Sequence, residues 1–154
     1  MEIKEGYMPF MGYQTYYRIV GKTEEGKSPI ILLHGGPGST HNYFELLDRV
    51  AESGRAVIMY DQLGCGNSFV EGHPELWTPE TWLNELCVLI DYLHIDHFHL
   101  LGQSWGGMLA IIYLIEKQAK GVKSAILSST LSSSKLWASE QHRMIKFMSK
   151  KDQQ

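Results

Sequence analysis

The sequence has few cysteines, no excess of positive charge and no long apolar run. Only two of its 154 residues are cysteines, Cys65 and Cys87, so it carries no disulfide framework like those of small secreted domains. Its 14 basic residues stand against 17 acidic ones, and the net charge of −3 argues against nucleic acid as a partner. No window reaches the roughly 18 consecutive apolar residues of a transmembrane helix, so no membrane span is expected.

A targeting signal is absent as well. Residues 1–11 mix polar and apolar side chains without the basic-then-apolar order of a secretory signal peptide. Together with the few cysteines, this predicts a cytoplasmic location, with association with the cell envelope as the alternative. What is present, 44% hydrophobic and 20% charged residues, is typical of a globular domain and excludes a disordered chain.

Strand-like and helix-like segments alternate along the chain. Short apolar or β-branched runs predict strands at 7–11, 13–20, 29–33, 56–60, 98–101 and 122–127. Helical periodicity predicts helices at 42–52, 79–93, 108–115 and 136–148. The alternation predicts the α/β class, with a mostly parallel sheet and helices on both faces.

Two of these helices carry a more specific expectation. The helix at 108–115 is apolar on every side, which predicts a central, buried position. The helix at 42–52 is expected because its apolar positions follow helical spacing; they are Tyr43, Leu46, Leu47 and Val50.

The strongest chemical signal is the pentapeptide Gly102-Gln103-Ser104-Trp105-Gly106. It matches G-x-S-x-G and lies between a predicted strand and a predicted helix, which is the context of a nucleophile elbow. Gly102 and Gly106 would let strand and helix approach closely, and the helix N-terminus would favour negative charge beside Ser104. The alternative interpretation is a glycine-rich turn with an incidental serine.

A second glycine-rich segment, His34-Gly35-Gly36-Pro37-Gly38, follows an earlier predicted strand. Acyl transfer needs N–H donors directed at the developing oxyanion, and one donor would be the backbone N–H of Trp105, directly after the serine. Pro37 has no N–H, so Gly36 is the expected second donor and Gly35 the substitute. The alternative is a tight turn that only redirects the chain.

The segment 61–68, Asp-Gln-Leu-Gly-Cys-Gly-Asn-Ser, follows another predicted strand. Asp61 can bind neighbouring backbone N–H groups, and Gly64 and Gly66 permit positive φ, so we interpret the segment as a supporting turn. A catalytic Cys65 is the alternative, which the absence of an adjacent histidine disfavours.

These three segments, in this order and at this spacing, resemble the α/β-hydrolase fold and, within it, the proline iminopeptidase (prolyl aminopeptidase) family of serine peptidases. The resemblance covers nearly the whole chain and is closest to members from lactic acid bacteria. It implies removal of an N-terminal residue, preferably proline, from short peptides, without metal or cofactor. It also implies that Ser104 is the nucleophile and that Gly36 and Trp105 are the oxyanion donors.

The catalytic acid and base are not found. In this fold the order is serine, then acid, then histidine, but only one histidine, His142, follows Ser104. It lies on a predicted surface helix, and none of the acidic residues after Ser104 follows a later strand; they are Glu116, Glu140 and Asp152. The chain is therefore expected to be the N-terminal portion of a hydrolase, with residues 1–130 in the core domain and 131–154 beginning the cap.

Three functions remain open. The first is part of a serine aminopeptidase, the second an esterase on the same scaffold, and the third a non-catalytic fragment or binding module. The sequence indicates no oligomeric state. It does predict that the strand at 122–127 forms an open, apolar sheet edge, so the isolated chain should behave poorly in solution.

Overall fold

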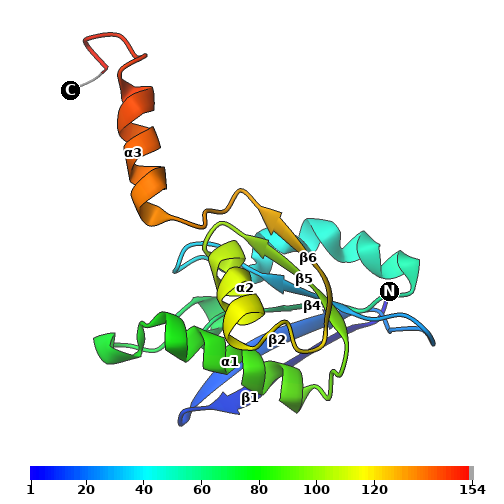
Figure 1. Ribbon diagram of the computed structural model, residues 1–154. Coiled ribbons are helices and arrows are strands. Elements are labelled where there is room, and N and C mark those ends of the chain that lie inside the picture. The colour runs from blue at the N-terminus through cyan, green and yellow to red at the C-terminus, as the bar shows by residue number, and fades with distance from the viewer. Residues whose placement is uncertain (153–154) are drawn as a thin grey trace.

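The computed structural model describes residues 1–152, which form a six-stranded sheet flanked by helices (Figure 1). The strands are β1 (Ile3–Phe10), β2 (Tyr13–Val20), β3 (Ile30–Leu33), β4 (Val57–Tyr60), β5 (Phe98–Gln103) and β6 (Val122–Ser128). The α-helices are α1 (Pro79–Tyr92), α2 (Trp105–Glu116) and α3 (Ser134–Ile145). The described residues also form three 3₁₀ helices: η1 (His41–Ser53), η2 (Gly66–Ser68) and η3 (Pro74–Leu76).

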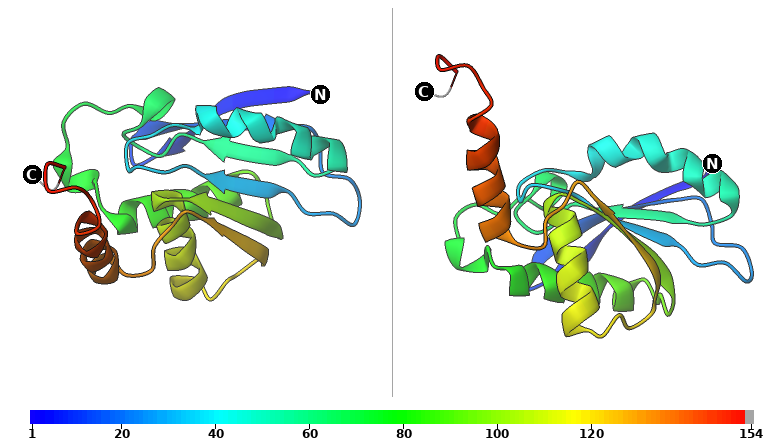
Figure 2. Two further views of the ribbon diagram at one scale, coloured as in Figure 1. Left: turned by 90° about the horizontal axis from the view of Figure 1, so that it is seen from above. Right: turned by 45° about the horizontal axis from the view of Figure 1, so that its top comes forward.

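The sheet has the order β1-β2-β4-β3-β5-β6. Strands β4, β3, β5 and β6 are parallel, while β1 and β2 form an antiparallel hairpin whose second strand pairs antiparallel with β4. Helices α1 and α2 cover one face and η1 covers the other (Figure 2). Cover on both faces explains why β3 and β4 read as continuous apolar runs, and the expected α/β class is confirmed.

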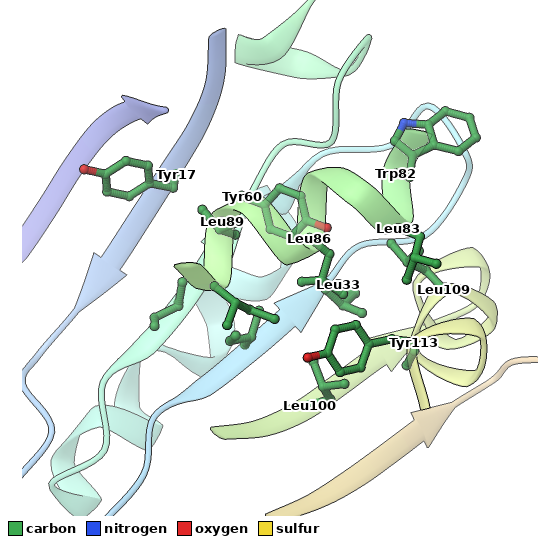
Figure 3. Close-up of a cluster of buried hydrophobic side chains, with 14 of the residues drawn as sticks. Tyr17, Leu33, Tyr60, Trp82, Leu83, Leu86, Leu89, Leu100, Leu109 and Tyr113 are labelled. Carbon is green, nitrogen blue, oxygen red and sulfur yellow. The ribbon is translucent and has the colours of Figure 1, made fainter. Parts of the chain in front are cut away.

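The larger core lies between the sheet and helices α1 and α2 (Figure 3). Leu86 and Leu89 of α1, Leu100 of β5 and Leu109 of α2 are all fully buried there. Helix α1 begins as predicted, because Thr78 caps it by accepting a hydrogen bond from the N–H of Thr81 at 3.2 Å, with proline in the first turn. This cap fixes the start of the helix that holds the larger core in place.

The helix expected at 42–52 is the 3₁₀ helix η1, and of its four regularly spaced apolar residues only Leu47 packs against the core. His41, Phe44 and Ala51 are the buried residues of η1, whereas the side chain of Leu46 is 86% exposed. His41 is held on the buried side by its hydrogen bonds to Asp61, and the spacing of apolar residues does not indicate this contact.

Helix α2 is covered on one side rather than buried all round. Gly106, Leu109, Ala110 and Tyr113 are buried against the sheet, whereas Ile115 is 67% exposed. The apolar outer side of α2 therefore faces solvent in this chain.

The end of the sheet is open as expected. Within residues 1–152, strand β6 pairs only with β5, and Ile126 and Leu127 are 51% and 45% exposed. Helix α3 projects away from the sheet and has no buried residue (Figure 1). Among residues 1–152, no helix combines the length and apolar character needed to cross a membrane.

One carboxyl group is enclosed in the larger core. Glu85 of α1 is fully buried and accepts hydrogen bonds from the Thr15 hydroxyl and, at 3.0 Å to each oxygen, from the N–H of Leu63. Burial raises the pKa of Glu85 to about 7, although both hydrogen bonds act in the opposite direction. The folded chain therefore keeps a proton on Glu85 at pH values where the unfolded chain has lost it.

The open edge predicts that the isolated chain associates with itself. We expect Ile126→Lys to reduce this association, because a lysine on an edge strand opposes pairing with a second edge. Leu46→Lys, at an exposed apolar position of η1, which packs on β3 and β4 rather than on β6, is the matched control and should leave association unchanged. Light scattering after size-exclusion chromatography at increasing concentration measures the effect. A monomer at every concentration would contradict the prediction.

For Glu85 we predict that its contribution to the free energy of unfolding falls as the pH rises. Its folded-state pKa lies above the unfolded value of 4.5, so its stabilising effect is complete below that value and is lost as the pH rises through about 7. Glu85→Gln keeps an acceptor for Leu63 and cannot ionise. The urea midpoint of the variant, relative to the native chain, should therefore increase between about pH 5 and about pH 8. A constant difference over that range would show that Glu85 does not titrate in this way.

Candidate active site

Ser104 lies in the turn between β5 and α2, with φ of 53° and ψ of −119°. This conformation is strained for a non-glycine residue, as expected for a nucleophile elbow. The turn is also tied to the segment that follows it in the chain. The N–H of Ser104 donates to the carbonyl of Ser128 at 2.9 Å, and the Thr130 hydroxyl donates to the carbonyl of Ser104 at 2.7 Å.

The two glycines of the pentapeptide allow close packing. A Cβ at Gly106 would overlap the carbonyl oxygen of Leu33 at the end of β3, and a Cβ at Gly102 would overlap the backbone of Gly106. The first turn of α2 therefore lies directly against the end of β3. This contact brings Ser104 beside the glycine-rich segment that follows that strand.

In the segment 34–38, the N–H groups of Gly35 and Gly36 were the two candidates for the second oxyanion donor, and only one of them is free. The N–H of Gly35 donates to the Tyr43 hydroxyl at 2.7 Å, so it is already occupied. The N–H groups of Gly36 and Trp105 have no acceptor among residues 1–152. Of the two expected alternatives for the second donor, the geometry favours Gly36.

A cavity of about 380 Å³ is lined by Ser104 and by Gly36 and Trp105, the two residues whose N–H groups are free. Its lining consists of Gly36, Pro37, Ser104, Trp105, Met108, Ser129, Thr130, Leu131 and Trp137. Trp137 belongs to α3, so the cavity lies between the sheet edge and the projecting helix. Its size and mixed lining suit part of a small-molecule ligand.

The turn at 61–68 is held by buried hydrogen bonds. Asp61 accepts from the N–H of His41 at 2.8 Å, from the His41 ring at 2.7 Å and from the N–H of Asn67 at 2.9 Å. Burial alone would raise the pKa of Asp61, but the hydrogen bonds from His41 and Asn67 lower it below its ordinary value. Gly64 and Gly66 have φ of 88° and 45°. These contacts agree with a supporting turn.

His34 cannot serve as a base. Its Nε2 accepts from the N–H of Gln62 at 3.0 Å, and its Nδ1–H donates to the carbonyl of Gly35 at 2.9 Å. An Nε2 that accepts a hydrogen bond carries no proton, so the ring is neutral, and burial lowers the pKa of His34 further. Both ring nitrogens are therefore occupied in holding the glycine-rich segment.

The later candidates for the acid and the base do not meet Ser104. His142 lies on the exposed α3, where its ring contacts the carbonyl of Ala138 at 2.7 Å. Neither His142 nor Glu116, Glu140 or Asp152 lines the cavity that contains Ser104. Within residues 1–152, Ser104 has no histidine partner.

Cys65 is not suited to act as the nucleophile. Its side chain is buried in the supporting turn, and burial raises the pKa of the thiol to about 11. The reactive thiolate is thus disfavoured at neutral pH.

Sequence reasoning missed three residues around the site. Tyr43 was noted only as an apolar position of a predicted helix, His41 was not singled out, and Gln62 received no role although it lies in a quoted segment. In the structure, Tyr43 also donates to Gln103 at 3.0 Å, and Gln62 bonds both His34 and Trp105. The only signal in the sequence is that Gln62 directly follows Asp61 at the end of a strand.

Comparison with known proteins places this geometry in a family. A family model described as alpha/beta hydrolase fold matches residues 28–150. The chain is 69% identical to a proline iminopeptidase from Clostridioides difficile, with 99% of this chain and 52% of that protein aligned. It is 63% identical to a proline iminopeptidase from Lactobacillus acidophilus, with 96% and 51% aligned. The chain thus spans about half the length of these curated relatives.

Solved structures agree with this assignment. The proline iminopeptidase of Mycobacterium smegmatis superposes with a TM-score of 0.87 at 32% identity, covering 95% of this chain and 50% of that one. The protein VinJ superposes with a TM-score of 0.89 at 37% identity, covering 97% and 51%. By sequence and by fold, the chain belongs to the α/β-hydrolase fold family.

Proposed function

We propose that this chain is the nucleophile-bearing part of a serine aminopeptidase that releases an N-terminal residue, preferably proline, from short peptides. The observation that carries the proposal is one cavity lined by Ser104, Gly36 and Trp105, in which the N–H groups of Gly36 and Trp105 have no acceptor among residues 1–152. The peptidase activity and the preference for proline rest on the names of the relatives.

In this proposal the Ser104 hydroxyl attacks the carbonyl carbon of the N-terminal residue. The new C–O bond moves the carbonyl electrons onto oxygen, and the N–H groups of Gly36 and Trp105 donate to that oxyanion. The N-terminus of α2, which begins at Trp105, adds favourable potential. The C–N bond then breaks, the amine leaves, and water hydrolyses the acyl-serine ester. No metal or cofactor takes part in these steps.

Proton transfer requires residues from outside this chain. A serine hydroxyl is a weak nucleophile until a base accepts its proton, and an acid must orient that base. Since no candidate in residues 105–152 lines the cavity, we infer that the acid and the base come from the part that the longer relatives have in addition. The chain alone is expected to be inactive.

The domain division is also a proposal. We assign residues 1–130 to the core and 131–154 to the start of a cap, of which residues 153 and 154 lie outside the described part. The projection of α3 from the sheet and the position of Trp137 on the cavity support this division (Figure 1). A cytoplasmic location is supported by the two free cysteines.

The test is a joined enzyme, made from this chain and the part of the C. difficile proline iminopeptidase that the chain does not match. We expect it to hydrolyse proline p-nitroanilide and to react with a fluorophosphonate probe, because the join supplies the missing acid and base. Ser104→Ala should abolish both. Ser124→Ala, a serine on β6 outside the cavity, is the matched control and should keep both.

Three outcomes would contradict the proposal. A folded joined enzyme without activity would support a non-catalytic role for this chain. Hydrolysis of p-nitrophenyl esters without hydrolysis of the proline arylamide would support an esterase. Turnover by the chain alone that Ser104→Ala removes would show that the acid and base lie within these 154 residues.

A further inference from the structure

The two N–H groups beside Ser104 belong to different segments of the chain. Gly36 follows β3, whereas Trp105 begins α2. An oxyanion hole works only when its donors keep a fixed separation and direction, because the stabilisation depends on preorganised geometry. Some contact must therefore couple the two segments.

Gln62 makes that contact with its side chain. The residue is fully buried just after β4. Its Oε1 accepts from the indole Nε1–H of Trp105 at 2.8 Å, and its Nε2 donates to the carbonyl of His34 at 3.0 Å. One amide group thus bridges the residue that carries the first donor and the start of the segment that carries the second.

The backbone of Gln62 acts on the second donor by another route. Its N–H donates to Nε2 of His34, which leaves the proton on Nδ1, and Nδ1–H donates to the carbonyl of Gly35. That carbonyl belongs to the same planar peptide group as the N–H of Gly36. The C=O and N–H bonds of a trans peptide group point in opposite directions. Fixing the carbonyl oxygen of Gly35 therefore also fixes the direction of the Gly36 N–H.

We propose that Gln62 is a positioning residue that aligns the N–H groups of Gly36 and Trp105 as one oxyanion hole. The inference rests on the proposed function of Ser104. It adds that the geometry of the hole is set by one residue of a third segment, Gln62 at the start of the turn at 61–68, which does not line the cavity.

The chemistry of the bridge explains why the residue is glutamine. The Trp105 indole can only donate and the His34 carbonyl can only accept, so the residue between them must offer one acceptor and one donor. A carboxylate would face the carbonyl with a second acceptor. An apolar side chain would leave both buried partners unpaired.

The turn itself is held rigidly on its other side. The N–H of Leu63 donates to Glu85, and the carbonyl of Leu63 accepts from the Trp82 indole at 3.1 Å. The Trp82 ring also packs edge-on against the Trp105 ring, with centroids 5.2 Å apart. Contacts with α1 therefore hold Leu63, and with it the neighbouring Gln62, in a fixed position.

The joined enzyme described above tests the inference. We expect Gln62→Met and Trp105→Phe each to lower kcat on proline p-nitroanilide by roughly 10- to 100-fold with little change in KM, because the donors would be displaced only slightly. The double variant should lose about as much as either single variant, since both substitutions break the same bridge.

Two inhibitors separate positioning from folding. Prolinal can form a tetrahedral adduct with Ser104 whose oxygen needs both donors, whereas prolinol has no carbonyl and cannot. The inhibition constant of prolinal should rise in both variants and that of prolinol should stay constant. Trp105→Phe retains the backbone N–H and an aromatic ring, so it tests the bridge even where Gln62→Met fails to fold.

Ser68→Ala is the matched control in the same turn. It removes two buried hydrogen bonds, to the carbonyl of Asp61 at 2.6 Å and from the N–H of Tyr16 at 2.8 Å, without touching the bridge. It should lower the urea midpoint and keep kcat. If both bridge variants behave like Ser68→Ala, Gln62 is merely structural and the inference fails while the proposed function stands. A joined enzyme without activity overturns both.

Discussion

The close packing of the first turn of α2 on the end of β3 is the constraint on which the site depends. Gly106 allows this contact, because any Cβ there would overlap the carbonyl of Leu33. Moving the helix outward would withdraw Ser104 and Trp105 together from the glycine-rich segment. The indole of Trp105 would then also leave Gln62. The position of the nucleophile thus depends on the absence of a side chain at Gly106.

Buried polar groups around this contact form a nearly complete network. An unpaired buried donor or acceptor costs about 1–3 kcal/mol, so such a network is stable only when its members satisfy one another. Among residues 1–152, the one buried side-chain polar atom without a partner is the Tyr60 hydroxyl. His34, Asp61 and Gln62, by contrast, are all satisfied within a few residues of the cavity. Such completeness favours one arrangement of the site over its alternatives.

Much of this could be predicted from the sequence, for local reasons. The strands β3 and β4 are short apolar runs bounded by glycine or polar residues, and the cap at Thr78 is a local hydrogen bond. The elbow was predictable because the same five residues determine both its backbone and its nucleophile.

What could not be predicted depends on contacts between distant segments. The bridge of Gln62 to Trp105 joins residues 43 positions apart, and no pattern within either segment encodes it. The buried side of η1 includes His41, whose hydrogen-bond partner Asp61 lies 20 positions further along the chain. The exposed outer side of α2 depends on which layers surround the helix, and composition alone does not specify these.

The hydrogen bonds between Ser104 and the residues at and after the end of β6 affect the order in which the site can form during translation. A ribosome releases the chain from its N-terminus, so residues 34–38 and 61–68 emerge well before the elbow. The elbow itself gains its hydrogen bonds to Ser128 and Thr130 only when β6 has formed. During translation the glycine-rich segment 34–38 can therefore fold before Ser104 is held beside it. The hydrogen bonds that tie down Ser104 thus become available only after the residues of both earlier glycine-rich segments have left the ribosome.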